Sequence, residues 1–339
     1  MPDMMGQCFK LVIALIILIL QLPAEANDTT ARVAAGGITF LKNDQIRLVQ
    51  EILEISTKMI RVRYRFLNEA DRDIRTVVAF PMPLYGWNPG VSAFDSNDKP
   101  LSSFVVQVDG HLVTTTKTQR AVIGERDVTD HLRKVGLSEA QIFKTFGDCS
   151  PDGKCGFTKT QEEKLKQLGG TERRFPPWKV AETIYWEQVF PAGKEIEVLH
   201  EYPPFVGMLY NAPYQKGFGY VSDIPTASWG KDPKEACLDA GTHQAIHKRI
   251  KSHVENGATM VWVTLEDVEF ILGTGRNWKG PIRDFKLRIE KDPPDQLISL
   301  CFPAKAKRVG SSTLEFSYSN FIPQDKLVIY FYTVTAERK

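Results

Sequence analysis

Hydrophobic and polar side chains alternate along many short segments of this chain. In residues 59–66, Arg61, Arg63 and Arg65 occupy every second position, and the positions between them are apolar. This period of two is typical of a strand with one face in a core and one in water. Turn residues separate this segment from residues 74–80, so we predict an antiparallel hairpin. Residues 180–190 and 195–202 repeat the pattern and predict a second hairpin.

Strand signals of this kind dominate the chain and predict a mainly β fold. Short strands at regular spacing favour two antiparallel immunoglobulin-like β-sandwich domains. We assign residues 27–125 to an N-terminal sandwich and residues 173–339 to a C-terminal sandwich. The two longest strand candidates, 260–272 and 282–290, flank a loop rich in Gly, Trp and basic residues.

Helical signals are confined to two places. Residues 126–172 contain short helices, one of them opened by a capping box of Ser138 and Gln141, and we interpret this segment as a small helical insertion. A longer amphipathic helix is predicted near 233–256, because Pro233 follows a capping Asp232 and Gly257 follows its end.

The first 26 residues have the pattern of a signal peptide. Lys10 precedes an apolar run over 11–20, and Ala24 and Ala26 give the small-x-small ending at which cleavage is expected. Ten apolar residues are too few to span a bilayer. We therefore expect an exported protein, periplasmic or secreted, with no transmembrane segment after cleavage. The formal net charge of +2 is too close to balance to favour nucleic acid as a partner.

Four cysteines follow the expected cleavage site. They are Cys149, Cys155, Cys237 and Cys301. An even number in an oxidising compartment favours two disulfides, although four cysteines allow three pairings. Proximity in the sequence favours Cys149 with Cys155, which would staple the helical insertion, and Cys237 would then pair with Cys301.

Two segments are candidate ligand-binding surfaces. One is the stretch 203–233, about thirty residues that we predict to form a long loop. It is a candidate surface because loops on β scaffolds commonly carry function. The other is the loop 276–279, where Trp278 either lids a core or faces solvent. The candidate ligand-binding residues are Tyr210, Tyr214, Phe218, Tyr220, Arg276, Asn277, Trp278 and Lys279.

Histidines spaced by one helical turn provide a candidate metal site. His243 and His247, with Asp239 a turn earlier, could hold a metal, or the two imidazoles could pack against a sheet. Likewise, the arginines at 61, 63 and 65 could bind an anion or pair with neighbouring carboxylates such as Glu51 or Glu54. We find no nucleophile motif and no phosphate loop, and we assign no catalytic residue and no cofactor.

Several motifs resemble those of a known family. They are Val62-x-Tyr64-x-Phe66-x-Asn68, Phe80-Pro81-x-Pro83, Trp186-x3-Phe190-Pro-Ala-Gly193, His200-x-Tyr202-x-Pro204 and Thr274-Gly-x-Asn-Trp278-x-Gly-Pro-Ile282-x-x-Phe285. The chain resembles the family catalogued as domain of unknown function 4424, exported proteins of Gram-negative bacteria. This resemblance implies a periplasmic or secreted location and supplies no catalytic residues.

The sequence favours a non-enzymatic function. The leading hypothesis is an exported binding or envelope-associated scaffold protein whose partner is an envelope protein or a glycan. The alternative is a secreted metal-dependent hydrolase centred on Asp239, His243 and His247.

Overall fold

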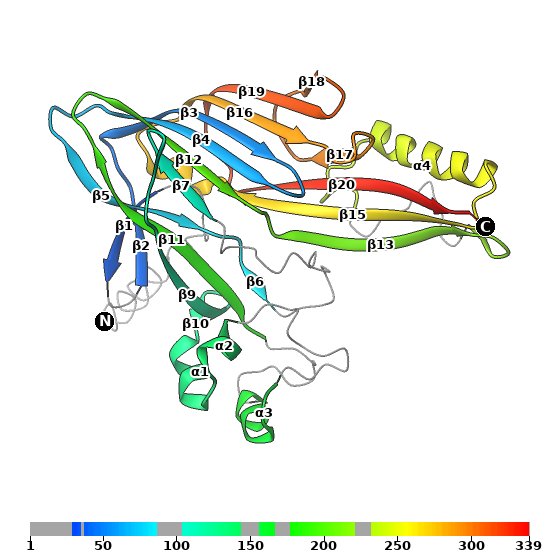
Figure 1. The fold of residues 1–339 in the computed structure, drawn as a ribbon, viewed down its shortest axis with the longest axis horizontal. Helices are drawn as coiled ribbons and strands as arrows, with labels where there is room; N and C mark the ends of the chain where they lie inside the picture. Colours follow the sequence, from blue (N-terminus) through cyan, green and yellow to red (C-terminus); the bar gives the residue numbers. More distant parts are fainter. Residues whose placement is uncertain are drawn as a thin grey trace, which may run out of the picture.

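The described part of the protein is mainly β and contains three sheets and four α-helices. The computed structural model describes residues 29–34, 37–86, 104–143, 156–166, 177–220 and 232–338. Figure 1 shows two sheets stacked at one end of the molecule and a third sheet that extends away from them to the C-terminus. The prediction of a mainly β fold is therefore confirmed.

Sheet A has the strand order β10-β9-β11-β5-β1-β2, with β6 beside β11. Its strands are β1 Thr29–Ala34, β2 Gly37–Leu41, β5 Ile74–Pro81, β6 Tyr85–Gly86, β9 Thr116–Ile123, β10 Arg126–Asp127 and β11 Lys179–Phe190.

Sheet B lies against sheet A and has the order β18-β19-β16-β3-β4-β12-β7-β8. Its strands are β3 Ile46–Ile55, β4 Ile60–Asn68, β7 Val105–Val108, β8 His111–Leu112, β12 Glu195–Tyr202, β16 Ile282–Glu290, β18 Lys307–Val309 and β19 Thr313–Phe321.

Sheet C, the extended third sheet, has the order β14-β13-β15-β20-β17. Its strands are β13 Val206–Gln215, β14 Gly219–Tyr220, β15 Met260–Ile271, β17 Leu297–Leu300 and β20 Lys326–Glu337. The helix α4, Ala240–Glu255, packs on one face of this sheet through Ile246 and Ile250.

The two predicted hairpins are wrong, although all four strands exist. β4 and β12 lie in sheet B, whereas β5 and β11 lie in sheet A, so each connection crosses from one sheet to the other. Alternation reveals which side of a strand is buried, but it does not indicate which other strand is the partner. The two crossings lie side by side, because β4 pairs with β12 and β5 pairs with β11.

Asn68 joins the two crossings at their turns. Its side-chain amide donates to the carbonyl oxygen of Phe190 at 2.8 Å, and its backbone N–H donates to the carbonyl oxygen of Lys194 at 3.2 Å. In return, the backbone N–H of Ala192 donates to Asp73 Oδ1 at 2.9 Å. The turns are thereby fixed to each other as well as to their own strands.

One hydrophobic core lies between sheets A and B and reaches into sheet C. It contains Leu48 near the start of the chain and Phe331 near its end. Strands from both predicted sandwich segments therefore pair in the same sheets and share this core. The immunoglobulin-like arrangement is not confirmed: β3 pairs with β16 in parallel, a pairing between distant segments that sequence periodicity cannot indicate.

The helical insertion contributes three short helices below sheet A (Figure 1). They are α1 Thr129–Val135, α2 Glu139–Ile142 and α3 Lys159–Lys166. The capping box of Ser138 and Gln141 is confirmed at the start of α2. Trp178 anchors the insertion by donating from Nε1 to the carbonyl oxygen of Ile142 at 2.9 Å. The predicted Cys149–Cys155 bridge lies outside the described residues.

The predicted long helix begins later than expected. α4 starts at Ala240 because Asp239 is the residue that caps it, and its carboxylate accepts a bond from the backbone N–H of Thr242 at 2.9 Å. A disulfide joins Cys237, just before the helix, to Cys301 after β17, as the pairing by proximity predicted. Within the described ranges, no helix is long and apolar enough to cross a membrane.

Candidate functional site

Trp278 is a core residue. It follows the 3-10 helix η4, Gly273–Asn277, and its side chain is 1% exposed. The indole ring lies 4.6 Å from the ring of Phe66 on β4 and 5.9 Å from that of Phe190 on β11, measured between ring centroids. Of the two alternatives for this residue, the structure favours the lid over a core, and the indole offers no surface to a ligand.

The other residues of the loop 276–279 also make internal contacts. Arg276 donates to Asp325 Oδ1 at 2.5 Å and to the carbonyl oxygen of Pro323 at 3.0 Å. The Asn277 side chain donates to Thr29 Oγ1 at 3.0 Å, and its carbonyl oxygen accepts from the backbone N–H of Asn43 at 2.7 Å.

Lys279 completes the anchoring of this loop. Its ammonium group lies 2.7 Å from Glu69 Oε2, and its backbone N–H donates to the carbonyl oxygen of Ile46. Hydrogen bonds from Arg47 and Lys279 lower the pKa of Glu69 to about 2. This loop therefore fastens β15 and β16 to the first strands of the chain.

Part of the predicted long aromatic loop forms strands. Residues 206–215 form β13, which pairs with β15, and β14 turns back onto the end of β13. Gly and Pro obscured this strand in the sequence, since both residues are depleted in strands. Residues 221–231 of the predicted loop lie outside the described residues.

Three aromatic side chains in the described part of this segment are exposed to solvent. Phe218 in the turn is 79% exposed, Tyr210 on β13 is 63% exposed and Tyr220 on β14 is 49% exposed. Tyr214 stands opposite Tyr220 in the pairing, with their ring centroids 5.4 Å apart in an edge-to-face arrangement. We name Tyr214, Phe218 and Tyr220, with the turn that carries them, the aromatic hairpin.

The candidate metal ligands do not form a ligand set in the described part of the chain. Asp239 uses both carboxylate oxygens to cap α4, since Oδ2 accepts from Thr242 Oγ1 at 2.6 Å. His243 and His247 lie half-buried on α4. Among the described residues, no group of three or more His, Cys, Asp or Glu side chains could hold a metal ion.

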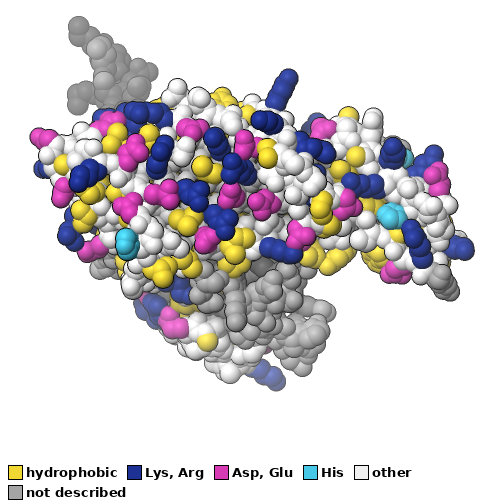
Figure 2. Space-filling view, turned by 45° about the horizontal axis from the view of Figure 1, so that its top comes forward, with side chains coloured by type: hydrophobic (Ala, Val, Ile, Leu, Met, Phe, Trp, Pro, Cys, Tyr) yellow, Lys and Arg dark blue, Asp and Glu magenta, His cyan; other side chains and the backbone are white. Residues whose placement is uncertain are grey.

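The arginine row on β4 is a face of ion pairs. Arg61 contacts Glu201 at 2.6 Å and Glu54 at 3.4 Å, which confirms the alternative in which the row pairs with neighbouring carboxylates. Arg63 lies 3.6 Å from Glu197. Figure 2 shows basic and acidic side chains interspersed over this face, so it has no single-sign patch for an anionic partner.

Sequence reasoning missed a buried carboxylate at an inward position of β11. Glu182 is 1% exposed; its Oε2 accepts from Gln119 Nε2 at 2.7 Å and from the Tyr85 hydroxyl at 3.3 Å. Among the described residues none donates a hydrogen bond to its Oε1, and Lys117 Nζ lies 3.8 Å from it. Burial raises the pKa of this carboxyl. A Glu within the alternation of residues 180–190 was the available signal.

A second buried titratable residue belongs to one of the sequence motifs. His200 on β12 is fully buried among aromatic rings, with Phe80 at 5.1 Å and Tyr64 at 5.4 Å between centroids. Burial lowers the pKa of this imidazole to about 3. The neutral imidazole thus serves as a core side chain.

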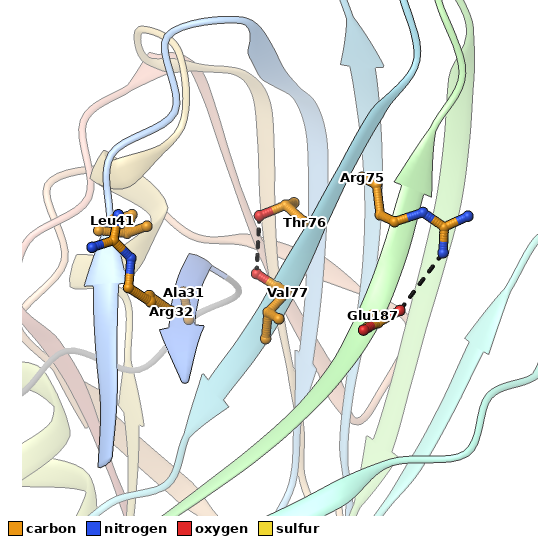
Figure 3. Close-up of a pocket in the computed structure, with 7 residues that line it drawn as sticks. All are labelled: Ala31, Arg32, Leu41, Arg75, Thr76, Val77 and Glu187. Carbon is orange, nitrogen blue, oxygen red and sulfur yellow. Dashed lines mark hydrogen bonds and ion pairs between the residues drawn. The ribbon is translucent and has the colours of Figure 1, made fainter. Parts of the chain in front are cut away.

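A shallow depression of about 370 Å³ lies on the outer face of sheet A. Figure 3 shows Thr76 and Val77 between Arg75 with Glu187 on one side and Arg32 on the other. Arg75 and Glu187 are mostly exposed and form an ion pair at 3.6 Å. Because its charged groups are solvated and already paired in part, we assign no ligand to this depression.

Solved structures match this chain at low identity and low TM-score. A candidate nutrient-binding protein of Legionella pneumophila matches with 12% identity and a TM-score of 0.44, over 91% of this chain and 70% of that one. An M1 zinc metallopeptidase of Deinococcus radiodurans matches with 9% identity and a TM-score of 0.27, over 86% of this chain and 44% of that one. None of the curated proteins matches this chain in sequence.

The comparison with family models covers far more of the sequence than the short motifs quoted in the sequence analysis. A family model described as a domain of unknown function (DUF4424) matches residues 26–330. The match spans the described strands of all three sheets up to the middle of β20. The chain therefore belongs to this family.

Proposed function

We propose that this protein is an exported binding protein that holds its ligand at the aromatic hairpin. The observation that carries the proposal is the exposure of Phe218 and Tyr220 within a few residues of each other on one rigid turn. Exposed aromatic rings that gather on a scaffold are typical of binding surfaces, because each ring buries a large area on contact.

The hairpin is held firmly enough to serve as such a surface. The backbone N–H of Phe218 donates to the carbonyl oxygen of Gln215 at 3.1 Å, and that of Lys216 donates to Thr259 at 2.8 Å. β13 pairs with β15 on both sides of one bulge between Asn211 and Tyr214. Little backbone conformational entropy is then lost when a ligand binds at these rings.

Export is the second part of the proposal. It is supported by Lys10, the apolar run 11–20 and the Ala24-x-Ala26 ending. The Cys237–Cys301 disulfide fits an oxidising compartment. In that setting, the partner is a glycan or a protein of the cell envelope.

A binding screen tests the ligand site. The purified protein is applied to a glycan array and to a panel of envelope proteins, and every hit is measured again with Phe218→Ala and Tyr220→Ala. The control is Leu112→Ala on β8, because Leu112 is 77% exposed and belongs to sheet B. We expect both hairpin variants to weaken the hits at least tenfold; hits that Leu112→Ala weakens equally, or that no variant weakens, contradict the site.

The location has its own test. Expression of the full chain in a Gram-negative host, followed by fractionation and N-terminal sequencing, is expected to give a processed protein that begins at Asn27. An unprocessed chain in the cytoplasmic fraction would contradict export and leave the binding proposal standing.

A further inference from the structure

Three cationic side chains from separate elements meet where sheet B ends beside α4. Lys291 directly follows β16, Arg308 is the middle residue of β18, and Arg249 lies on α4. Figure 1 shows β18 and α4 on the same side of sheet C. The three residues are distant in the sequence, so only the fold brings their charges together.

Lys291 and Arg308 belong to the same face of sheet B. Arg308 lies opposite Leu314, and Leu314 lies opposite Ile289, so these residues form one row across three strands. Lys291 is two residues beyond Ile289, and the period of two along a strand puts it on the same face. Because Ile289 is fully buried in the core, this is the inward face, and the two cations lie at its rim.

Backbone hydrogen bonds fix the position of Lys291. Its N–H donates to the carbonyl oxygen of Ser312 at 2.9 Å, which extends the pairing of β16 with β19. The turn that follows is held by Gln296, a residue 1% exposed whose Oε1 accepts from the backbone N–H of Asp292 at 2.9 Å. The Asp292 carboxylate forms an ion pair with Lys58, so it does not compensate the charge of Lys291.

Positive charge exceeds negative charge at this rim. Arg249 donates to the carbonyl oxygen of Asp295, and its Nη1 lies 3.8 Å from Asp295 Oδ2, so we count Arg249 as a charge and not as a donor for a ligand. In the described part of the chain, neither Lys291 nor Arg308 has an ion pair or a side-chain hydrogen bond. Three cations against one carboxylate leave an excess of two positive charges.

This excess is unfavourable in the free protein. Burial lowers the pKa of the Lys291 ammonium, and the positive charges of Arg308 and Arg249 lower it further, against the opposing effect of Asp295. On the arginine row of β4, by contrast, each guanidinium has a carboxylate within 3.6 Å. A ligand that supplies negative charge at the rim would remove the repulsion and stabilise the folded protein.

We propose that Lys291 and Arg308 bind a phosphate group, either inorganic phosphate or a phosphomonoester, at the rim of sheet B. Such a group carries about 1.5 to 2 negative charges at pH 7, which matches the excess of positive charge. Arg308 offers the planar fork of donors that suits phosphate oxygens, and Lys291 adds a point charge. A carboxylate, with a single charge, would leave half of the excess uncompensated. The site uses β16 and β18 and is separate from the aromatic hairpin.

Calorimetric titration with inorganic phosphate tests the site. The ionic strength is held at about 0.15 M, where charges more than about 8 Å apart are largely screened. We expect saturable binding by the wild type and an affinity at least about tenfold lower in Arg308→Gln and in Lys291→Gln, because each loses a charge-assisted hydrogen bond. No saturable binding by the wild type overturns the proposal.

The matched control variant is Lys307→Gln. Lys307 is exposed and adjacent to Arg308 on β18, and the alternation along a strand points it to the other face. The change removes the same charge from the same strand, so phosphate affinity should remain close to that of the wild type. A loss equal to that in Arg308→Gln would show a general effect of charge and overturn the assigned contacts.

Thermal unfolding separates binding from a structural role of Lys291. Lys291→Gln removes a repelled charge, so without phosphate its melting temperature should equal or exceed that of the wild type. Phosphate should raise the melting temperature of the wild type and leave that of this variant unchanged. An equal rise in both proteins would reflect general stabilisation by the salt and overturn the site.

Vesicle flotation identifies the source of the phosphate. Vesicles of phosphatidylcholine that contain phosphatidic acid present a phosphomonoester on a lipid, and vesicles of phosphatidylcholine alone are the control. Retention that requires Lys291 and Arg308 assigns a lipid phosphate, whereas calorimetric binding without retention assigns a soluble phosphate compound, and both results support the site. Phe218→Ala should leave phosphate affinity unchanged, and a loss in this variant would contradict a site separate from the aromatic hairpin.

Discussion

We expect the Trp278 side chain to make a large contribution to the unfolding free energy. Its ring touches Phe66 in sheet B and Phe190 in sheet A, with centroid distances of 4.6 Å and 5.9 Å. The indole therefore joins the two crossings that connect these sheets. Trp278→Ala removes this joint while leaving the surface of the protein unchanged, because the side chain is 1% exposed.

The expected loss of unfolding free energy is large. Truncation of a buried aromatic side chain to alanine costs about 3–5 kcal/mol, and the cost is highest where the site cannot collapse around the cavity. Collapse is resisted here because backbone bonds on both sides of Trp278 hold the loop: Asn43 donates to Asn277 at 2.7 Å, and Lys279 donates to Ile46 at 2.9 Å. We therefore expect a loss in the upper half of that range, about 4–5 kcal/mol.

Urea unfolding, monitored by far-ultraviolet circular dichroism, measures this loss. The signal does not depend on the fluorescence of Trp278, which the variant lacks. The control is Phe218→Ala, an aromatic truncation at a position 79% exposed, which is expected to change stability by less than about 0.5 kcal/mol. A loss below about 1 kcal/mol in Trp278→Ala, or equal losses in both variants, would refute the assignment of Trp278 to the core.

Four further changes test the titratable groups, the disulfide and the helix cap. The pKa of His200 is lowered to about 3, so below about pH 6.5 the unfolded chain binds a proton that the folded chain does not. Stability should then fall toward pH 3 by about 1.4 kcal/mol per pH unit from this group, and His200→Gln should lack that contribution in urea titrations at several pH values. Glu182 has a raised pKa, so the stability of its protonated form is lost as pH rises above about 4.5. Glu182→Gln should therefore gain stability over the wild type with rising pH, and parallel pH curves would contradict this. Cys237→Ser should cost about 2–4 kcal/mol in urea unfolding, and adding Cys301→Ser should cost little more, because either change removes the same bond. Asp239→Ala should cost about 1 kcal/mol of unfolding free energy, because the cap of α4 is lost. Added zinc should leave the melting temperatures of the wild type and of this variant unchanged. A zinc-induced rise in the wild type alone would support the metal site.

Local patterns in the sequence predicted the elements well because their causes are local. The inward positions of β4 follow from its alternation, and the capping box of Ser138 and Gln141 follows from spacing within one helical turn. Pairing between strands has no such local cause. The same alternation fits a hairpin and a crossing between sheets, so the partners of β4 and β5 were assigned wrongly.

The candidate site residues also differ in how far local sequence can place them. Composition alone points to Tyr210, Phe218 and Tyr220, and their exposure agrees with a surface role. The sequence does not decide between core and surface for Trp278, because a Trp beside Gly and basic residues fits both environments. Only the approach of Phe66 and Phe190, distant in sequence, decides between them.

Experiments can distinguish the two candidate surfaces, the loop 276–279 and the aromatic hairpin. In the loop 276–279, Arg276 is bound to Asp325 and Lys279 to Glu69, so a variant there acts on the joint between sheets before it acts on any ligand. In the aromatic hairpin, Phe218 extends into solvent and supports no described part of the core. Loss of binding with unchanged unfolding free energy can therefore arise at the hairpin and not at the loop. A loop variant that lost binding while keeping full stability would place the ligand beside Arg276 and overturn the hairpin assignment.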